Sequence, residues 1–72
     1  MKSIYSGEYQ KLVEKLKQAR LSAGLTQKEV ARKLGKPQSF VSKVESGERR
    51  LDAIELKFLA ELYRVKMSTL LG

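Results

Sequence analysis

Apolar residues recur at intervals of three and four along most of this chain, which is the spacing of one face of an α-helix. The first such repeat runs from about Gly7 to Ala23. Its apolar members are Tyr9, Leu12, Val13, Leu16, Ala19 and Ala23. Gly24 follows, and glycine commonly ends a helix in the left-handed conformation. Residues 1–6 carry no strong pattern, and we expect them to form a flexible lead-in.

A second, shorter helix is predicted to begin after Thr26 and to end at Gly35. Thr26 and Glu29 have the spacing of a capping box, in which the hydroxyl accepts from the helix N-terminus and the carboxylate reaches back to the cap backbone. Leu25 and Val30 are placed to form the hydrophobic staple. The expected buried stripe consists of Val30, Ala31 and Leu34. Gly35 then supplies the positive φ that a sharp turn needs.

A third helix is predicted from about Pro37 to Glu45, with the proline as its first helical residue, where a missing N–H is no loss. Its inward-facing residues are expected to be Phe40, Val41 and Val44. Its outward-facing residues are expected to be Gln38, Ser39, Ser42 and Lys43. Ser46 and Gly47 end the helix.

A basic loop (Glu48–Leu51) leads to a second capping box, formed by Asp52 and Glu55. The apolar residues of the fourth helix that follows are Ile54, Leu56, Phe58, Leu59, Leu62 and Tyr63. A last short helix is predicted around residues 68–71. The alternation typical of β-strands does not occur, so we predict an all-α fold. It is a compact bundle of about five short helices in one domain, residues 1–72.

Composition narrows the range of functions. The chain has neither histidine nor cysteine, so it lacks the commonest general base, the commonest metal ligand and any thiolate. It also lacks clustered carboxylates and a glycine-rich phosphate loop, so we expect no enzyme, no metal, no cofactor and no small-molecule ligand. No apolar run approaches the roughly 18 residues of a membrane span. We therefore expect no membrane contact and a cytoplasmic protein.

The net charge of +7 favours polyanionic partners, because each phosphate contact releases condensed counterions. The positive charge is concentrated between Gln27 and Arg50. The cationic residues there are Lys28, Arg32, Lys33, Lys36, Lys43, Arg49 and Arg50, against the acidic Glu29, Glu45 and Glu48. A basic pair of helices of this kind points to double-stranded DNA as the partner.

Two short helices joined at Gly35 can cross closely while one of them keeps a polar face free for the DNA major groove. The positions that carry this geometry are Gln27, Ala31, Gly35, Val41 and Val44, followed by Glu45 and Gly47. With this pattern, the chain from Arg20 to Leu71 resembles the DNA-binding domain of the phage repressor and Cro (XRE-type) helix-turn-helix regulators. The resemblance implies a lambda-repressor-like fold with the helix around 37–45 in the major groove. The motif core that packs the two helices together is Ala31, Gly35, Val41 and Val44.

The resemblance assigns four residues of the third helix to the edges of DNA bases. They are Gln38, Ser39, Ser42 and Lys43. Glutamine can pair with adenine in a bidentate way, and lysine can donate to guanine O6 or N7. Lys43 could equally contact phosphate, and all four positions also fit an ordinary exposed helix face. Phe40 is expected in the core, the alternative being a contact with a thymine methyl group.

A second group of residues matches the family's contacts to the DNA backbone. The group consists of Gln27, Lys36, Ser46, Gly47, Arg49 and Arg50. Gln27 opens the second helix, where the helix dipole favours an anion, although a solvated glutamine fits the same position. Gly47 lets the backbone approach the phosphates, while Arg49 and Arg50 supply charge. Glu48 fits this group poorly and is equally explained as a solvated acidic tip.

The resemblance also implies a partly buried ion pair between Arg20 and Glu45, because an arginine on an apolar stripe needs a partner. The pair would tie the first helix to the end of the third. Two positions depart from the family's pattern. Pro37 stands where a Ser or Thr usually caps the third helix, and Arg64 stands where a Gly often ends the fourth. The start of the third helix and the turn before Val65 therefore stay open.

These implications combine into a sequence-specific DNA-binding transcriptional regulator, expected to be a repressor. A symmetric dimer would hold two recognition helices about 34 Å apart on a near-palindromic operator. The expected homodimer surface consists of Val65, Met67, Leu70 and Leu71. Leu70 and Leu71 could instead close the core of a single chain. The alternative from another class is a protein-interaction module, which a stripe of exposed leucines would favour.

Overall fold

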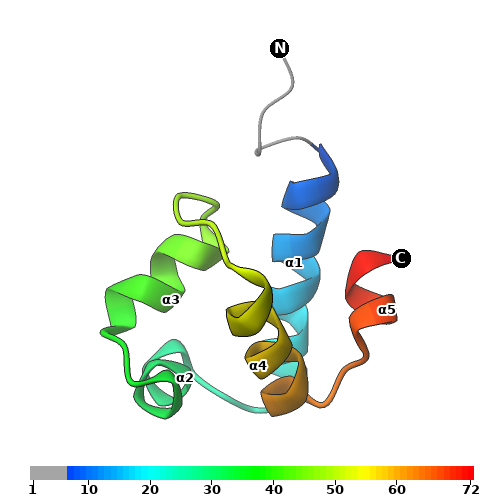
Figure 1. Ribbon diagram of the computed structural model, residues 1–72. Helices are drawn as coiled ribbons and strands as arrows, with labels where there is room; N and C mark the ends of the chain where they lie inside the picture. The colour runs from blue at the N-terminus through cyan, green and yellow to red at the C-terminus, as the bar shows by residue number, and fades with distance from the viewer. Residues whose placement is uncertain (1–6) are drawn as a thin grey trace.

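The computed structural model describes residues 7–72, and all regular structure within that range is helical (Figure 1). The helices are α1 (Gly7–Ser22), α2 (Gln27–Leu34), α3 (Gln38–Glu45), α4 (Ala53–Tyr63) and α5 (Met67–Leu71). The predicted all-α fold is confirmed, and the helix bounds are close to those expected. The expected lead-in, residues 1–6, lies outside the described residues.

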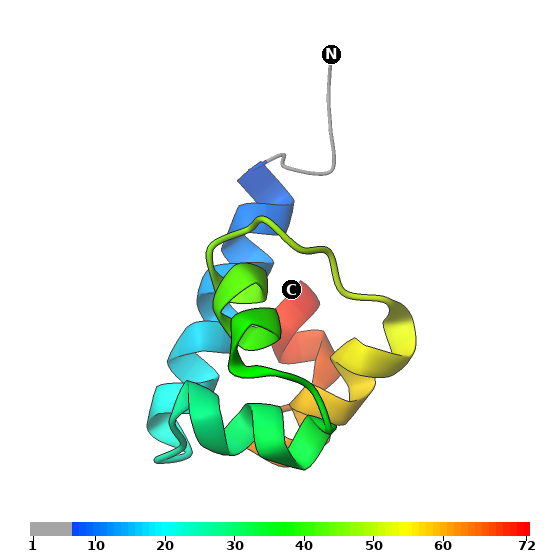
Figure 2. The ribbon, with the colours of Figure 1, turned by 90° about the vertical axis from the view of Figure 1, so that its left-hand side faces the viewer.

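Helix α1 occupies the centre of the fold, with α4 in front of it in Figure 1. It packs against α3, α4 and α5, while α2 packs against α3. Figures 1 and 2 show α3 on one side of the molecule and α5 on the opposite side. The outer surface of α3 therefore faces away from α5.

Residues with the predicted helical spacing form one hydrophobic core. Leu16 of α1 and Val30 of α2 are fully buried. The other buried members are Ala19, Ala31, Phe40, Val41, Val44, Leu59, Ala60, Tyr63 and Leu70. Leu70 is only 3% exposed because α5 packs it against the rest of the chain. Its assignment to a dimer surface is therefore corrected: Leu70 closes the core of a single chain.

Two apolar residues of α4 stay outside the core. Ile54 is 75% exposed and Phe58 is 39% exposed. The buried residues of the same helix are Leu59, Ala60 and Tyr63. Since only one face of α4 can meet the core, apolar residues on its other faces remain at the surface.

Both predicted capping boxes are confirmed. The Thr26 hydroxyl accepts the Glu29 N–H at 3.1 Å, and the Glu29 carboxylate accepts the Thr26 N–H at 2.8 Å. Asp52 and Glu55 make the same reciprocal pair at 2.7 and 3.0 Å. The hydrogen bonds from the Thr26 backbone and side chain lower the pKa of Glu29 below its ordinary value. The starts of α2 and α4 are thus set by local sequence.

The start of α3 differs from the prediction. Pro37 is not the first helical residue but lies one position before the helix, in an extended conformation with φ −69° and ψ 156°. The proline ring fixes φ and leaves ψ free, so the chain can stay extended after the turn at Gly35. The Pro37 carbonyl accepts the Phe40 N–H at 2.9 Å. Helix α3 therefore begins at Gln38 without a side-chain cap.

The turn after α4 has left-handed geometry without a glycine. Arg64 adopts φ 60° and ψ 44°, the conformation that Gly35 adopts after α2 with φ 71°. Among residues 7–72, Arg64 is the one non-glycine residue with positive φ. The turn is closed by the Val65 N–H, which donates to the Ala60 carbonyl at 3.0 Å. Arg64 thus occupies the position where the family often has glycine, and the turn keeps its shape.

Candidate nucleic-acid interface

The exposed side of α3 carries the four residues predicted to reach DNA bases. Gln38, Ser39, Ser42 and Lys43 are all exposed, and we call them the recognition face. The opposite side of the helix consists of Phe40, Val41 and Val44, which are 8%, 4% and 2% exposed. Figure 2 shows α3 on the side of the molecule turned toward the viewer. The core thus fixes the orientation of the recognition face.

A buried ion pair holds the C-terminal end of α3 against α1. Arg20 Nε lies 2.6 Å from Glu45 Oε2, and Arg20 Nη2 lies 3.0 Å from Glu45 Oε1. The two side chains are 8% and 7% exposed, so the predicted pair is confirmed and is well buried. Arg20 Nη1 also donates to the Leu25 carbonyl at 2.8 Å. The hydrogen bond to Glu45 raises the pKa of Arg20 above its ordinary value, although burial opposes this effect.

Gln27 has a structural partner that the sequence did not indicate. Its side-chain Nε2 donates to Glu45 Oε1 at 3.0 Å. One carboxylate therefore joins α1, α2 and α3 through Arg20 and Gln27. No local pattern could reveal this contact, because 18 positions separate the two residues. The expected contact of Gln27 with phosphate stays a prediction, and its backbone lies at the start of α2, where N–H groups lack partners within the helix.

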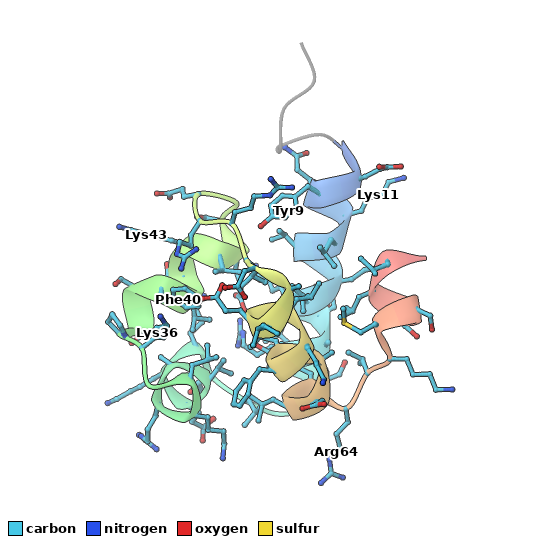
Figure 3. The ribbon with its side chains drawn as sticks, viewed as in Figure 1. Tyr9, Lys11, Lys36, Phe40, Lys43 and Arg64 are labelled. Carbon is cyan, nitrogen blue, oxygen red and sulfur yellow. The ribbon has the colours of Figure 1, made fainter. Side chains whose placement is uncertain are left out.

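Two of the expected phosphate-contacting cations lie over the ring of Phe40. Lys36 Nζ is 5.3 Å and the Arg49 guanidinium carbon is 4.7 Å from the ring centroid. Figure 3 shows Lys36 and Phe40 close together at the start of α3. Arg49 also pairs with Glu55 at 3.4 Å and donates to the Arg50 carbonyl. Phe40 thus belongs to the core while its ring attracts two cations beside the recognition face.

The loop after α3 is folded back onto that helix. The N–H groups of Ser46 and Gly47 donate to Ser42 and Val44, and those of Glu48 and Arg49 both donate to Lys43. Gly47 has φ 85°, which permits this tight return. These amides are occupied within the chain, so we expect the side chains of this loop to make most of its contacts with phosphate, while Gly47 shapes the loop backbone.

Helix α1 supports the same loop from the other side. The Tyr9 hydroxyl donates to the Arg49 carbonyl at 3.4 Å, and the Arg50 guanidinium lies 5.5 Å from the Tyr9 ring centroid. The Ser46 hydroxyl lies 3.1 Å from both the Lys43 carbonyl and the Glu48 carboxylate. Glu48 therefore has a partner within the loop. The sequence did not indicate the contact between Tyr9 and the loop, because it depends on how α1 crosses α3.

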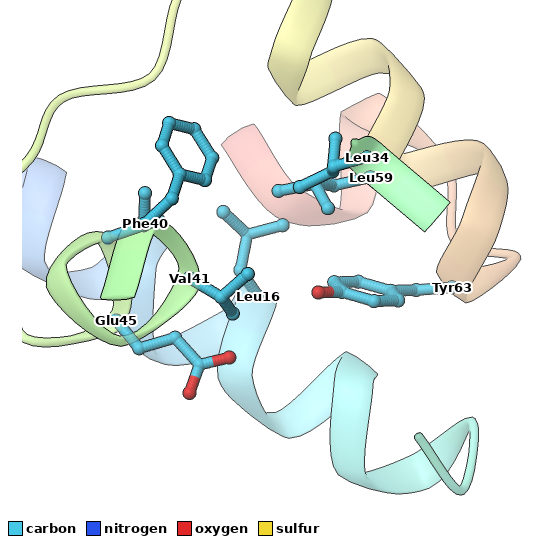
Figure 4. A pocket seen from close by; sticks show the side chains of 8 residues that line it. Leu16, Leu34, Phe40, Val41, Glu45, Leu59 and Tyr63 are labelled. Carbon is cyan, nitrogen blue, oxygen red and sulfur yellow. The ribbon is translucent and has the colours of Figure 1, made fainter. Parts of the chain in front are cut away.

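A small cavity lies beneath α3 (Figure 4). Its lining consists of Leu16, Leu34, Phe40, Val41, Val44, Glu45, Leu59 and Tyr63. Its volume of about 10 Å³ is on the scale of a single water molecule, far below that of a cofactor site. Burial raises the pKa of Tyr63 to about 12, and the negative charge of Glu45 adds to this effect while Arg20 opposes it.

Residues 7–72 contain no cluster of three potential metal ligands of the His, Cys, Asp or Glu type. No helix within that range is both long enough and apolar enough to cross a membrane. Of the remaining residues expected at a dimer surface, Val65 and Met67 are partly buried against the core, whereas Leu71 is 64% exposed. All of them lie at or near α5, on the side of the molecule opposite α3 (Figure 1).

A short helix fixed by the core, a glycine turn before it and a second helix across it define a helix-turn-helix DNA-binding domain. The family model described as Helix-turn-helix matches residues 16–70, and the chain belongs to this family, in its XRE (Cro/C1) type. The structure is similar to that of an "XRE-family like protein from Pseudomonas syringae pv. tomato str. DC3000". The two are 48% identical with a TM-score of 0.83, over 94% of this chain and 83% of the other. No curated protein matches the chain.

Its family and its similarity to the solved relative identify the protein as a DNA-binding regulator of transcription. The residues that sequence analysis assigned to bases lie on one exposed helix face, and most of those assigned to phosphates lie around the edge of that helix. Gln27 is set apart from them by its bond to Glu45.

Proposed function

We propose that the protein inserts α3 into the DNA major groove and reads base edges with the recognition face. The observation that carries this proposal is the contrast between the two sides of α3. One side is buried and tied to α1 through Glu45, and the other presents only polar side chains to solvent. Because the core fixes the backbone of α3, DNA binding has to order the exposed side chains but not the helix that carries them.

We assign affinity for the DNA backbone to the residues that the sequence matched to the family's phosphate contacts. These are Gln27, Lys36, Ser46, Gly47, Arg49 and Arg50. The side chains of Lys36 and Arg49 already lie over the ring of Phe40 in the free protein. Their contacts with phosphate release counterions and are independent of sequence, so they set the strength of binding while the recognition face sets its specificity.

We further propose that two copies bind a near-palindromic operator and repress transcription from an overlapping promoter. Two-fold symmetry of the protein requires matching symmetry in the DNA, with half-sites about one helical turn apart. A pair of small domains on one face of the duplex would block polymerase access. A reporter gene placed behind such an operator should lose expression when the protein is produced.

Selection of bound sequences from a random DNA pool by the wild-type chain tests this function. An enriched palindromic consensus with half-sites about 10 base pairs apart supports it. A pool that remains random after repeated rounds would contradict sequence-specific binding. Enrichment of a lone half-site would contradict only the symmetric arrangement.

A further inference from the structure

Helix α4 exposes an apolar pair within an otherwise charged stripe. The stripe consists of Ile54, Lys57, Phe58 and Glu61, which are all exposed and lie at the spacing of one helix face. We call it the α4 stripe. Ile54 is 75% exposed and Phe58 is 39% exposed, on successive turns of that face. A contiguous exposed apolar patch can mark a protein–protein contact site.

The position of α4 suits a contact between two DNA-bound copies. In Figure 2, α3 faces the viewer and α4 forms one flank of the molecule. A second copy joined at this flank leaves both α3 helices on the same side, where one duplex can contact them. Helix α5, in contrast, lies on the opposite side of the molecule from α3 (Figure 1).

The charges of the α4 stripe are self-complementary. Lys57 and Glu61 flank Phe58 on the same face. When two such helices pack antiparallel about a two-fold axis at Phe58, Lys57 of each copy comes within a turn of Glu61 of the other. Ile54 then lies beside the central aromatic pair. A surface with both charge signs in this order can pair with its own copy.

We propose that the α4 stripe is the surface through which two copies of this chain associate, with their α4 helices antiparallel. This inference rests on the proposed function, whose symmetric dimer it places on α4 in preference to the predicted α5 surface. The patch is small and each chain carries a charge of +7, so the copies associate weakly in solution. DNA phosphates offset that repulsion, and the contact appears as cooperative binding to paired half-sites.

The test compares two duplexes made from the selected consensus, one with both half-sites and one with a single half-site. Their affinities give the coupling factor between two bound copies, expected for the wild type in the range of about 5–150-fold. The substitutions Ile54→Ser and Phe58→Ser together should reduce this factor to about 1, as for independent sites. Affinity for the single half-site should stay unchanged, since neither residue lies on α3. Circular dichroism confirms that the variant is folded.

A charge exchange tests the antiparallel arrangement. Lys57→Glu should lower the coupling factor, and adding Glu61→Lys should restore it, because the exchanged pair again has opposite charges. Equal losses in the single and double variants would overturn this arrangement. Leu71→Ser is the matched control on α5 and should keep the wild-type factor.

Unchanged coupling in the Ile54 and Phe58 variant, or its loss in Leu71→Ser, would overturn the α4 surface while leaving DNA binding intact. Absence of coupling in the wild type would also overturn it. Failure of the proposed function has a different signature, because the wild type would then bind neither duplex more tightly than random DNA.

Discussion

Arg20 on α1 contacts both carboxylate oxygens of Glu45, the last residue of α3, with one contact at 2.6 Å and the other at 3.0 Å. The Gln27 amide shares one of these oxygens. A single buried carboxylate therefore sets how the recognition helix lies relative to α1 and α2. The DNA-binding surface depends on this contact although none of the three side chains belongs to the recognition face.

Glu45→Ala should lower the free energy of unfolding by about 3 kcal/mol, because it leaves the Arg20 guanidinium buried without its counter-ion. Urea unfolding measures this change. Replacing both partners with apolar residues, Arg20→Met with Glu45→Leu, should recover much of the loss, since no charge then stays buried. A melting temperature for Glu45→Ala equal to that of the parent would show that the ion pair does not stabilise the fold.

Because Tyr63 is buried, we expect the protein to lose stability in alkaline solution when this side chain ionises. Burial raises its pKa from 10.0 to about 12, so folding favours the neutral hydroxyl. This contribution is complete below pH 10 and is lost as the pH rises toward 12. The melting temperature of the wild type should fall more steeply over that interval than that of Tyr63→Phe, which has no proton to lose there. Parallel curves for the two proteins would contradict the raised pKa.

We expect a substitution at Arg64 to stabilise the fold. Its β-carbon is strained at φ 60°, at a cost of roughly 1 kcal/mol that glycine avoids. Arg64→Gly should therefore raise the melting temperature by about 4 °C, allowing for the greater freedom of glycine in the unfolded chain. Arg64→Ala is the matched control, because it keeps the β-carbon and should melt near the wild type. Equal gains in both variants would attribute the effect to the lost charge.

The features predicted from the sequence are those set by near neighbours. Thr26 with Glu29 and Asp52 with Glu55 place two helix starts, because each capping box needs only four residues. The pairing of Arg20 with Glu45 came from the family resemblance, since no local rule joins positions so far apart. At Pro37 the local rule was wrong, because the ring leaves ψ undetermined.

Tertiary placement decides the remaining features. Ile54 and Phe58 fit the apolar pattern of α4 as well as Leu59 does, yet only Leu59 faces the core. Lys36 lies in the turn before α3 and Arg49 in the loop after it, so the approach of both cations to the Phe40 ring depends on the paths of these two segments. Leu70 and Leu71 are adjacent in the sequence, and the direction of α5 buries one and exposes the other.

The salt dependence of DNA binding tests the role of Arg49. If it contacts phosphate, Arg49→Ala should weaken binding to all sequences and reduce the slope of log affinity against log salt by about 1. Fluorescence anisotropy titrations at several salt concentrations give this slope. Lys66→Ala is the control, because this exposed lysine precedes α5 on the far side of the molecule and should leave the slope unchanged. Equal slopes for wild type and Arg49→Ala would remove Arg49 from the phosphate contacts.

The central claim is that the exposed face of α3 reads bases, and the base preference of Gln38→Ala tests it most directly. Affinities are measured for the selected operator and for each of its single-base-pair substitutions, with wild type, Gln38→Ala, Ser42→Ala and Arg49→Ala. Gln38→Ala and Ser42→Ala should each lose discrimination at particular base pairs, with a bidentate contact worth about 1–3 kcal/mol. Arg49→Ala should bind every sequence more weakly with the same ranking. A uniform loss in all three variants would contradict the assignment of the recognition face.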